Sequence, residues 1–310
     1  MDKPTKFLTK RNLYLVLSVS LVLALAASVF ALEIPKGKTG EDFVNEAKVN
    51  VQGISPEKTK MLLDGTDNVV LLDIRSFTEF KESGWIAGRT VLPHGMVIFK
   101  ITEIVPNKDV PIIAYCKKGK RSALIAYHLK QMGYEDVRWL EGGILGWKKS
   151  GLPIEKSGNS AIAEKPVVPA GEMPIGKTAD DFVAEANKAV KAVSPSDAKR
   201  IMETKDAVLL DIRSEQERKS QGAMNGALVM EHGKVVFNIM KKIHDANKPI
   251  LVICKKGSRS ALVAHQLQQM GYKDVHYIKG GIIAWKEAGA PCIKTNTMIH
   301  DEQQQLKVRL

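Results

Sequence analysis

The sequence predicts an α/β protein of two tandem domains, each a mostly parallel sheet flanked by helices. Residues 111–122 (PIIAYCKKGKRS) and 249–260 (PILVICKKGSRS) match at an offset of 138 residues, and similar matches extend over most of each half. A repeat of roughly 110–120 residues is long enough to form its own core, so it indicates a duplicated domain. Within each copy, apolar runs alternate with segments of helical periodicity, as in sheets covered by helices on both faces.

The N-terminal segment, residues 1–31, is predicted to be a signal peptide or a retained membrane anchor. Basic residues precede an apolar run from 13 to 30, which is long enough to span a bilayer if it is not removed. Either outcome places the rest of the chain in the periplasm or otherwise outside the cytoplasm. The sequence further predicts domain 1 at 38–154, a linker at 155–172, domain 2 at 173–294 and a polar tail at 295–310.

Each copy begins with a helix signal followed by buried strands. Ser55-Pro56 and Ser194-Pro195 have the pattern of a helix N-cap followed by a first-turn proline. The continuous apolar runs at 69–72 and 207–210 predict strands buried on both faces. The same pattern predicts strands at 112–115 and 250–253.

The second half of each copy predicts a helix, a short strand and a Gly-Gly turn. Residues 122–132 and 260–270 have helical spacing, and Gly133 and Gly271 follow where a left-handed cap is expected. Shorter strands are expected at 137–140 and 275–278, before Gly-Gly. The tryptophans that follow, Trp147 and Trp285, are interpreted as core residues.

Charge and cysteine content narrow the class of function. The chain has a net charge of +12, but export argues against nucleic acid and favours small anions, anionic surfaces or acidic partners. Cys116 and Cys254 end buried strands in separate domains, which does not suit a disulfide framework. We interpret Cys292 as an inert thiol, with a resolving or metal-contacting role as the alternative. No metal or cofactor is expected.

The loop after each cysteine has the composition of an anion cradle. Backbone N–H groups in a tight, glycine-containing loop can converge on one point, and the following helix adds its positive end there. A thiol in this position is expected to be largely ionised near neutral pH and able to hold a persulfide or an oxyanion. The candidate cradle residues are Lys117, Lys118, Gly119, Lys120, Arg121 and Ser122, and in the second copy Lys255, Lys256, Gly257, Ser258, Arg259 and Ser260.

Other polar residues are assigned supporting or structural roles. The loop arginine is expected to brace the loop, for example against Asp73 or Asp211, more than to contact substrate. His94 and His232 follow a short edge strand and are interpreted as structural. The supporting residues are Asp73, Arg75, Asp211 and Arg213.

These motifs together resemble the rhodanese family of sulfurtransferases. The resemblance covers 38–154 and 177–294 and rests on Cys-x-x-x-x-Arg-Ser, Leu-Leu-Asp-Ile-Arg and Gly-Tyr…Gly-Gly…Trp. It implies that Cys116 and Cys254 carry sulfur as a persulfide. Trp85 replaces the histidine of the family's Gly-His-Ile-x-Gly, and Gly222-Ala-Met-Asn-Gly226 departs further, which affects the rim of the site more than its chemistry.

The implied reaction is a double displacement without a separate cofactor. The thiolate takes the outer sulfur of thiosulfate or a similar donor, and cyanide, a thiol or a redox protein then accepts it. Lysines beside the cysteine favour thiosulfate over mercaptopyruvate.

Other classes of function remain as alternatives. A cysteine phosphatase has five residues between Cys and Arg, whereas both loops here have four; arsenate reduction is disfavoured alongside it. A thiol oxidoreductase would need Cys116 and Cys254 to pair across domains. An exported relay that binds sulfur or selenium with little turnover is the main alternative.

Overall fold

The computed structural model describes residues 33–65, 68–156 and 168–293. The predicted signal or anchor, part of the linker and the polar tail lie outside the described residues. Within the described ranges, no helix is long and apolar enough to cross a membrane.

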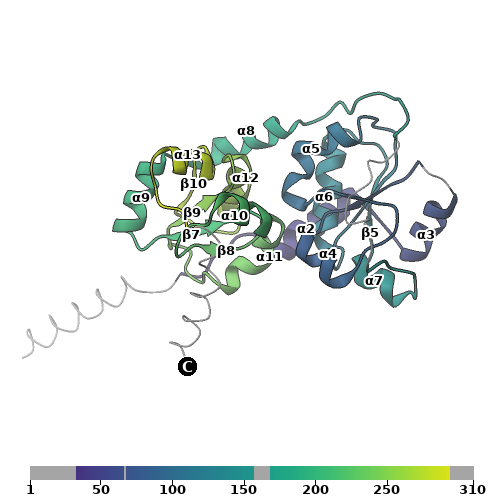
Figure 1. The fold of residues 1–310 in the computed structure, drawn as a ribbon, viewed down its shortest axis with the longest axis horizontal. Coiled ribbons are helices and arrows are strands. Elements are labelled where there is room, and N and C mark those ends of the chain that lie inside the picture. The colour runs from purple at the N-terminus through teal and green to yellow at the C-terminus, as the bar shows by residue number, and fades with distance from the viewer. Residues whose placement is uncertain (1–32, 66–67, 157–167, 294–310) are drawn as a thin grey trace, which may run out of the picture.

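The described residues form two α/β domains that lie side by side (Figure 1). The elements of the first are α2 (Gly40–Asn50), β1 (Gln52–Ile54), α3 (Pro56–Gly65), β2 (Val70–Asp73), α4 (Phe77–Ser83), β3 (Arg89–Val91), η1 (His94–Met96), α5 (Val97–Ile104), β4 (Ile112–Tyr115), α6 (Lys120–Gln131), β5 (Val137–Leu140) and α7 (Gly143–Lys149). Those of the second are α8 (Ala179–Ala189), β6 (Lys191–Val193), α9 (Pro195–Thr204), β7 (Val208–Asp211), α10 (Glu215–Gln221), β8 (Leu228–Val229), η3 (His232–Lys234), α11 (Val235–Asn238), η4 (Ile239–Lys241), β9 (Ile250–Ile253), α12 (Ser258–Gln269), β10 (Val275–Ile278) and α13 (Gly281–Glu287).

Each domain contains one five-stranded parallel sheet, which confirms the predicted fold class. The strand orders are β1-β5-β4-β2-β3 and β6-β10-β9-β7-β8, so β4 and β9 are the central strands. The strands predicted at 112–115 and 250–253 are found at those residues. The edge strands β1 and β6 were not predicted, because each has only three residues and is only partly buried.

Alternate residues of the central strands face two hydrophobic layers. In the first domain, Ile112 and Ala114 pack with α5 and α6, while Ile113 and Tyr115 pack with the cluster that includes residues of α3 and α7. This is the burial on both faces that a continuous apolar run predicts. The sheet therefore holds the residue after β4 in a fixed position.

The segment before each domain's first helix binds the other domain. The backbone N–H of Lys38 donates to the carbonyl of Gln269 at 2.8 Å, and the N–H of Lys177 donates to that of Gln131 at 2.9 Å. Phe182 of α8 also belongs to the core cluster of the first domain. The two domains are therefore joined by reciprocal contacts as well as by the linker.

The loops around η1 and η3 form the centre of this interface. A Cβ at Gly95 would lie 2.8 Å from His232, and one at Gly233 would lie 2.7 Å from His94. The pairs of contacts are equivalent under the 138-residue offset. The chain is thus folded like a dimer of two similar halves, with a pseudo-two-fold relation near these histidines.

Candidate active site

Both predicted cysteines lie directly after a central strand, at its carboxyl end. Cys116 follows β4 and Cys254 follows β9, and the two residues are 2% and 1% exposed. Both thiols are free. Open α/β sheets commonly bind ligands at this edge, so the sheet places each sulfur where a ligand can be held.

Each sulfur accepts a hydrogen bond from its own loop. The N–H of Gly119 donates to Cys116 Sγ at 3.2 Å, and the N–H of Gly257 donates to Cys254 Sγ at 3.1 Å. Gly119 has φ +90° and Gly257 has φ +99°, which side chains resist. One loop N–H therefore bonds to each sulfur, and the convergence of the other loop N–H groups stays a prediction.

The helices after the loops begin beside the sulfurs. α6 starts at Lys120 and α12 at Ser258, so the positive end of each helix dipole lies next to its cysteine. Ser122 Oγ lies 3.7 Å from Cys116 Sγ and donates to the Gly119 carbonyl at 3.0 Å. This arrangement favours negative charge on sulfur.

The Gly-Gly turns hold the cysteine loops against the next helix. The N–H of Ile144 donates to the Cys116 carbonyl at 2.9 Å, and Ile282 does the same to Cys254. A Cβ at Gly143 or Gly281 would lie 2.4 Å from the cysteine carbonyl oxygen. Sequence analysis identified these glycines only as part of the repeat.

The loop arginines are braced, but by a different acid from the one predicted. Arg121 donates to Glu79 at 2.9 and 2.5 Å through its two Nη atoms, and Arg259 makes the same bidentate pair with Glu217. The examples of Asp73 and Asp211 as partners were wrong, because their carboxylates bind Arg75 and Arg213. Glu and Arg are separated by 42 residues in both copies, and this shared spacing could have indicated the pair from the sequence.

The charges of this pair are mutually stabilising. Burial would raise the pKa of Glu79, but hydrogen bonds from Arg121 and its charge, with Lys234, lower that pKa to about 2. Burial would lower the pKa of Arg121, yet Glu79 and the Cys116 thiolate raise it above its usual value. Arg121 therefore stays charged beside the sulfur, while Glu79 binds both of its Nη atoms.

The supporting residues form a buried ion pair below each loop. Arg75 donates to Asp73 through Nε at 2.8 Å and Nη2 at 2.6 Å, and both side chains are inaccessible to solvent. Arg213 and Asp211 repeat this pair. In the first domain, the hydroxyl of Tyr115 also donates to Asp73 at 2.7 Å. Each pair ties the turn after β2 or β7 to the last residue of that strand, which lies beside the strand that precedes the cysteine. In the first domain, Tyr115 also ties β4 itself to Asp73.

The predicted lysines lie outside the cradle. Lys117 and Lys118 are exposed, as are Lys255 and Lys256. Lys120 forms an ion pair with Glu41 of α2. These lysines therefore contribute long-range positive charge at the mouth of the site. Ser258 is partly buried and, like Lys255 and Lys256, lines the cavity described next.

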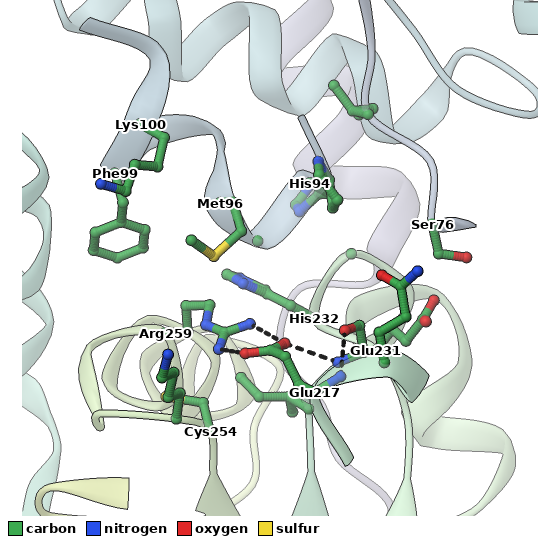
Figure 2. Close-up of a pocket in the computed structure, with 18 of the residues that line it drawn as sticks. Ser76, His94, Met96, Phe99, Lys100, Glu217, Glu231, His232, Cys254 and Arg259 are labelled. Carbon is green, nitrogen blue, oxygen red and sulfur yellow. Dashed lines mark hydrogen bonds and ion pairs between the residues drawn. The ribbon is translucent and has the colours of Figure 1, made fainter. Parts of the chain in front are cut away.

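A cavity of about 540 Å³ opens in front of Cys254, between the two domains. Figure 2 shows Cys254 and the Arg259–Glu217 pair on one side, with Met96 and Phe99 on the other. Cys116 does not line this cavity, although Arg121 does. Sequence analysis missed this wall, because it is built from a different domain from the one that carries the cysteine.

The remaining tryptophans and the third cysteine occupy buried or half-buried positions. Trp85 is buried, and its Nε1–H donates to Glu155 at 2.6 Å, so it is a core residue. Trp147 and Trp285 are core residues, as predicted. Cys292 is half-buried, and burial raises the pKa of its thiol. Within the described residues, no group of three His, Cys, Asp or Glu side chains could hold a metal ion.

Comparison with known proteins gives a consistent result for both domains. The family model described as "Rhodanese-like domain" matches residues 55–150 and residues 194–288. A sulfurtransferase of Allochromatium vinosum is 38% identical over 104 residues, which cover 34% of this chain and 94% of that protein. Thiosulfate sulfurtransferase GlpE of Actinobacillus succinogenes is 31% identical over 99 residues, covering 32% of this chain and 86% of that protein.

A solved structure supports the two-domain fold. The crystal structure of a thiosulfate sulfurtransferase from Pseudomonas aeruginosa aligns with a TM-score of 0.59 at 21% identity. The alignment covers 78% of this chain but only 45% of that chain. At this identity the likeness concerns the fold alone. Each of the two sequence relatives aligns over about the length of one domain.

Proposed function

The chain belongs to the rhodanese family of sulfurtransferases, and from that premise we propose that both domains move sulfane sulfur from thiosulfate to cyanide or a thiol. The observation that carries this proposal is the pair of cradled cysteines. In each domain a buried sulfur accepts a loop N–H bond, at 3.2 Å in the first and 3.1 Å in the second, next to a helix N-terminus. Both domains have the same parts, so both are assigned activity.

The first half-reaction loads the cysteine. The thiolate attacks the outer sulfur of thiosulfate, a new S–S bond forms, and the original S–S bond breaks as sulfite leaves with its electron pair. The persulfide anion that results is negatively charged. The loop N–H and the helix N-terminus stabilise that charge.

The second half-reaction removes the outer sulfur from the cysteine persulfide. Cyanide or a thiolate attacks the outer sulfur of the persulfide, and the cysteine leaves as a thiolate. The product is thiocyanate or an organic persulfide, and no net electrons enter or leave the protein. The glutamate partners of Arg121 and Arg259 hold both arginines, so each cysteine loop keeps its geometry in both half-reactions.

The choice of thiosulfate rests on charge and size. Exposed Lys117 and Lys118, and their equivalents in the second copy, surround the mouth of each loop with positive charge. Such a field attracts a small dianion. The N-terminal pattern supports an extracytoplasmic location, where such an anion would be met outside the cell membrane.

The test is thiosulfate-dependent formation of thiocyanate by the full chain and three variants. Cys116→Ser and Cys254→Ser should each retain part of the activity, and the double variant should retain none. Loss of all activity in one single variant would leave the other domain as a relay or sulfur-binding unit. No turnover in the unmodified chain would contradict the choice of thiosulfate.

A further inference from the structure

The two active sites differ in what faces them from the opposite domain. Cys254 opens into the interdomain cavity, whose lining from the first domain includes Phe77, Met96 and Phe99, together with Lys100 and Arg121. In Figure 2, Met96 and Phe99 lie across the cavity from the Arg259 side chain. Cys116 lines no part of this cavity. This cavity therefore serves only one of the two sulfurs.

The asymmetry can be traced to one pair of equivalent positions. Met96 corresponds to Lys234 under the 138-residue offset, and both are the last residues of their short helices. Lys234 Nζ lies 3.7 Å from Glu79 and 2.8 Å from Glu231. Glu79 is the partner of Arg121. A charged contact between domains thus reaches Glu79, which holds Arg121 at the Cys116 site.

On the Cys254 side the corresponding contact is apolar. The thioether of Met96 carries no charge to offer Glu217, the equivalent of Glu79. A second pair of equivalent positions also has an apolar residue in the first domain and a charged residue in the second. Phe77 corresponds to Glu215, whose carboxylate accepts a hydrogen bond from Thr78 at 2.9 Å. At these two positions the second domain therefore presents charged residues, whereas the first domain presents Met96 and Phe77 to the cavity in front of Cys254.

The size and lining of the cavity suit a molecule larger than thiosulfate. Cavities of 300–1,000 Å³ lined by apolar side chains with a few polar groups are typical of small organic ligands. The cavity of about 540 Å³ falls in this range. A small dianion gains nothing from the Phe77, Met96 and Phe99 surfaces, but an organic group does, because it removes apolar surface from water.

We propose that Cys254 delivers sulfur to an organic thiol with an apolar body, which binds against Met96 and Phe99, whereas Cys116 is restricted to small acceptors. This inference rests on the proposed function and assigns its acceptor class. The organic thiolate attacks the outer sulfur of the Cys254 persulfide, forms an organic persulfide and releases the Cys254 thiolate. A second molecule of the thiol then attacks this product, giving the organic disulfide and hydrogen sulfide, so the thiol is the reductant.

The experiment uses full-length single-site chains with thiosulfate as donor. Cys116→Ser leaves only Cys254, and Cys254→Ser leaves only Cys116. Each receives cyanide, 2-hydroxyethanethiol or phenylmethanethiol, with thiocyanate or sulfide release measured. We expect the ratio of kcat/KM for phenylmethanethiol to that for 2-hydroxyethanethiol to be about tenfold or more higher for the Cys254 site, as for burial of a small apolar group.

Reciprocal substitutions test the residue that creates the difference. Met96→Lys, made in the Cys116→Ser chain, should lower this ratio about tenfold, and Lys234→Met, made in the Cys254→Ser chain, should raise it. Methionine and lysine have side chains of similar length, so charge is the main change. Met61→Lys is the control, because Met61 is 74% exposed on α3 and lines neither of the two cavities described between the domains.

The outcomes separate this inference from the function on which it rests. Suppose that both single-site chains transfer sulfur to cyanide and have the same ratio of kcat/KM for phenylmethanethiol to that for 2-hydroxyethanethiol. This result would overturn the inference and leave the proposed function standing. An equal effect of Met61→Lys and Met96→Lys would also overturn it. No transfer to cyanide by either chain would overturn the proposed function and the inference with it.

Discussion

His94 and His232 meet edge to face across the domain interface, with ring centroids 5.4 Å apart and an angle of 73° between the rings. Both nitrogens of His94 and Nδ1 of His232 are shielded from solvent and have no hydrogen-bond partner within the described residues. Sequence analysis interpreted both residues as structural. Their position at the centre of the interface agrees with that interpretation and has a consequence for stability.

The histidine pair predicts loss of stability in mild acid. Burial, with Arg259 and His128, lowers the pKa of His232 to about 3; burial, with His232, Arg121 and His128, lowers that of His94 well below its usual value. Below about pH 6.5 the unfolded chain binds protons that the folded chain does not, so the free energy of unfolding falls as pH decreases. The maximum slope is about 1.4 kcal/mol per pH unit for each histidine.

Urea unfolding between pH 7 and pH 5 measures this effect. The window avoids Glu79, whose stabilising contribution is lost only as pH falls below about 4.5 towards its folded pKa of about 2. The His94→Asn, His232→Asn double variant should have a shallower dependence on pH, whatever its absolute stability. An unchanged slope in the double variant would show that other groups control the response.

The buried carboxylates predict unequal losses of stability in the two domains. Asp73 accepts bonds from Arg75 and Tyr115, and Arg89 Nε lies 3.4 Å away. Asp211 has Arg213, but Ile253 and Ala227 occupy the positions equivalent to Tyr115 and Arg89. Removing one charge from a buried pair costs roughly 3–5 kcal/mol, because the other is left unpaired.

We therefore expect Asp73→Asn to lower the free energy of unfolding more than Asp211→Asn does. Asp73→Asn leaves two arginines without their carboxylate, whereas Asp211→Asn leaves one. Urea unfolding at pH 7 of the two variants provides the comparison, with each serving as the matched control for the other. An equal or larger loss in Asp211→Asn would contradict the account of the buried pairs.

The loop glycines predict a local effect on sulfur transfer. A Cβ at Gly119 would lie 3.0 Å from the Trp139 ring, and φ is +90°. Gly119→Ala should therefore displace the N–H that bonds to Cys116, at a strain of about 1–3 kcal/mol. In the Cys254→Ser chain we expect thiocyanate formation to fall about tenfold, as a loss of about 1.4 kcal/mol implies.

Gly65→Ala is the control for this change. A Cβ at Gly65, the last residue of α3, meets no atom within 4 Å, and its φ is not positive. This variant should transfer sulfur at the unmodified rate. If Gly119→Ala does the same, then the bond from Gly119 to the sulfur does not contribute to the reaction.

The parts of the structure that were predicted correctly depend on local sequence. The apolar runs at 112–115 and 250–253 are continuous, as expected for strands that are buried on both faces. These runs therefore predicted the central strands and the position of each cysteine at a strand end. The glycine in each loop predicted the tight turn that brings an N–H to the sulfur, and the helical pattern after the loop predicted a helix that begins beside the sulfur. Each of these features lies within a few residues of the cysteine.

The missed features depend on contacts between distant segments. Glu79 meets Arg121 across 42 residues, and Met96 faces the Cys254 loop from another domain. Neither hydrophobic periodicity nor turn composition specifies such partners. Comparison of the two repeats could have suggested the Glu–Arg pair, since both copies keep it, but the cavity depends on the packing of the domains against each other.

Peptide mass analysis of the chain after exposure to thiosulfate, without an acceptor, tests the central claim most directly. We expect an increment of about 32 Da, one sulfur atom, on the peptides that contain Cys116 and Cys254, and both increments should disappear after cyanide is added. The peptide that contains Cys292 should carry none. Absence of the increment from both loop cysteines, or its presence on Cys292 alone, would contradict the account.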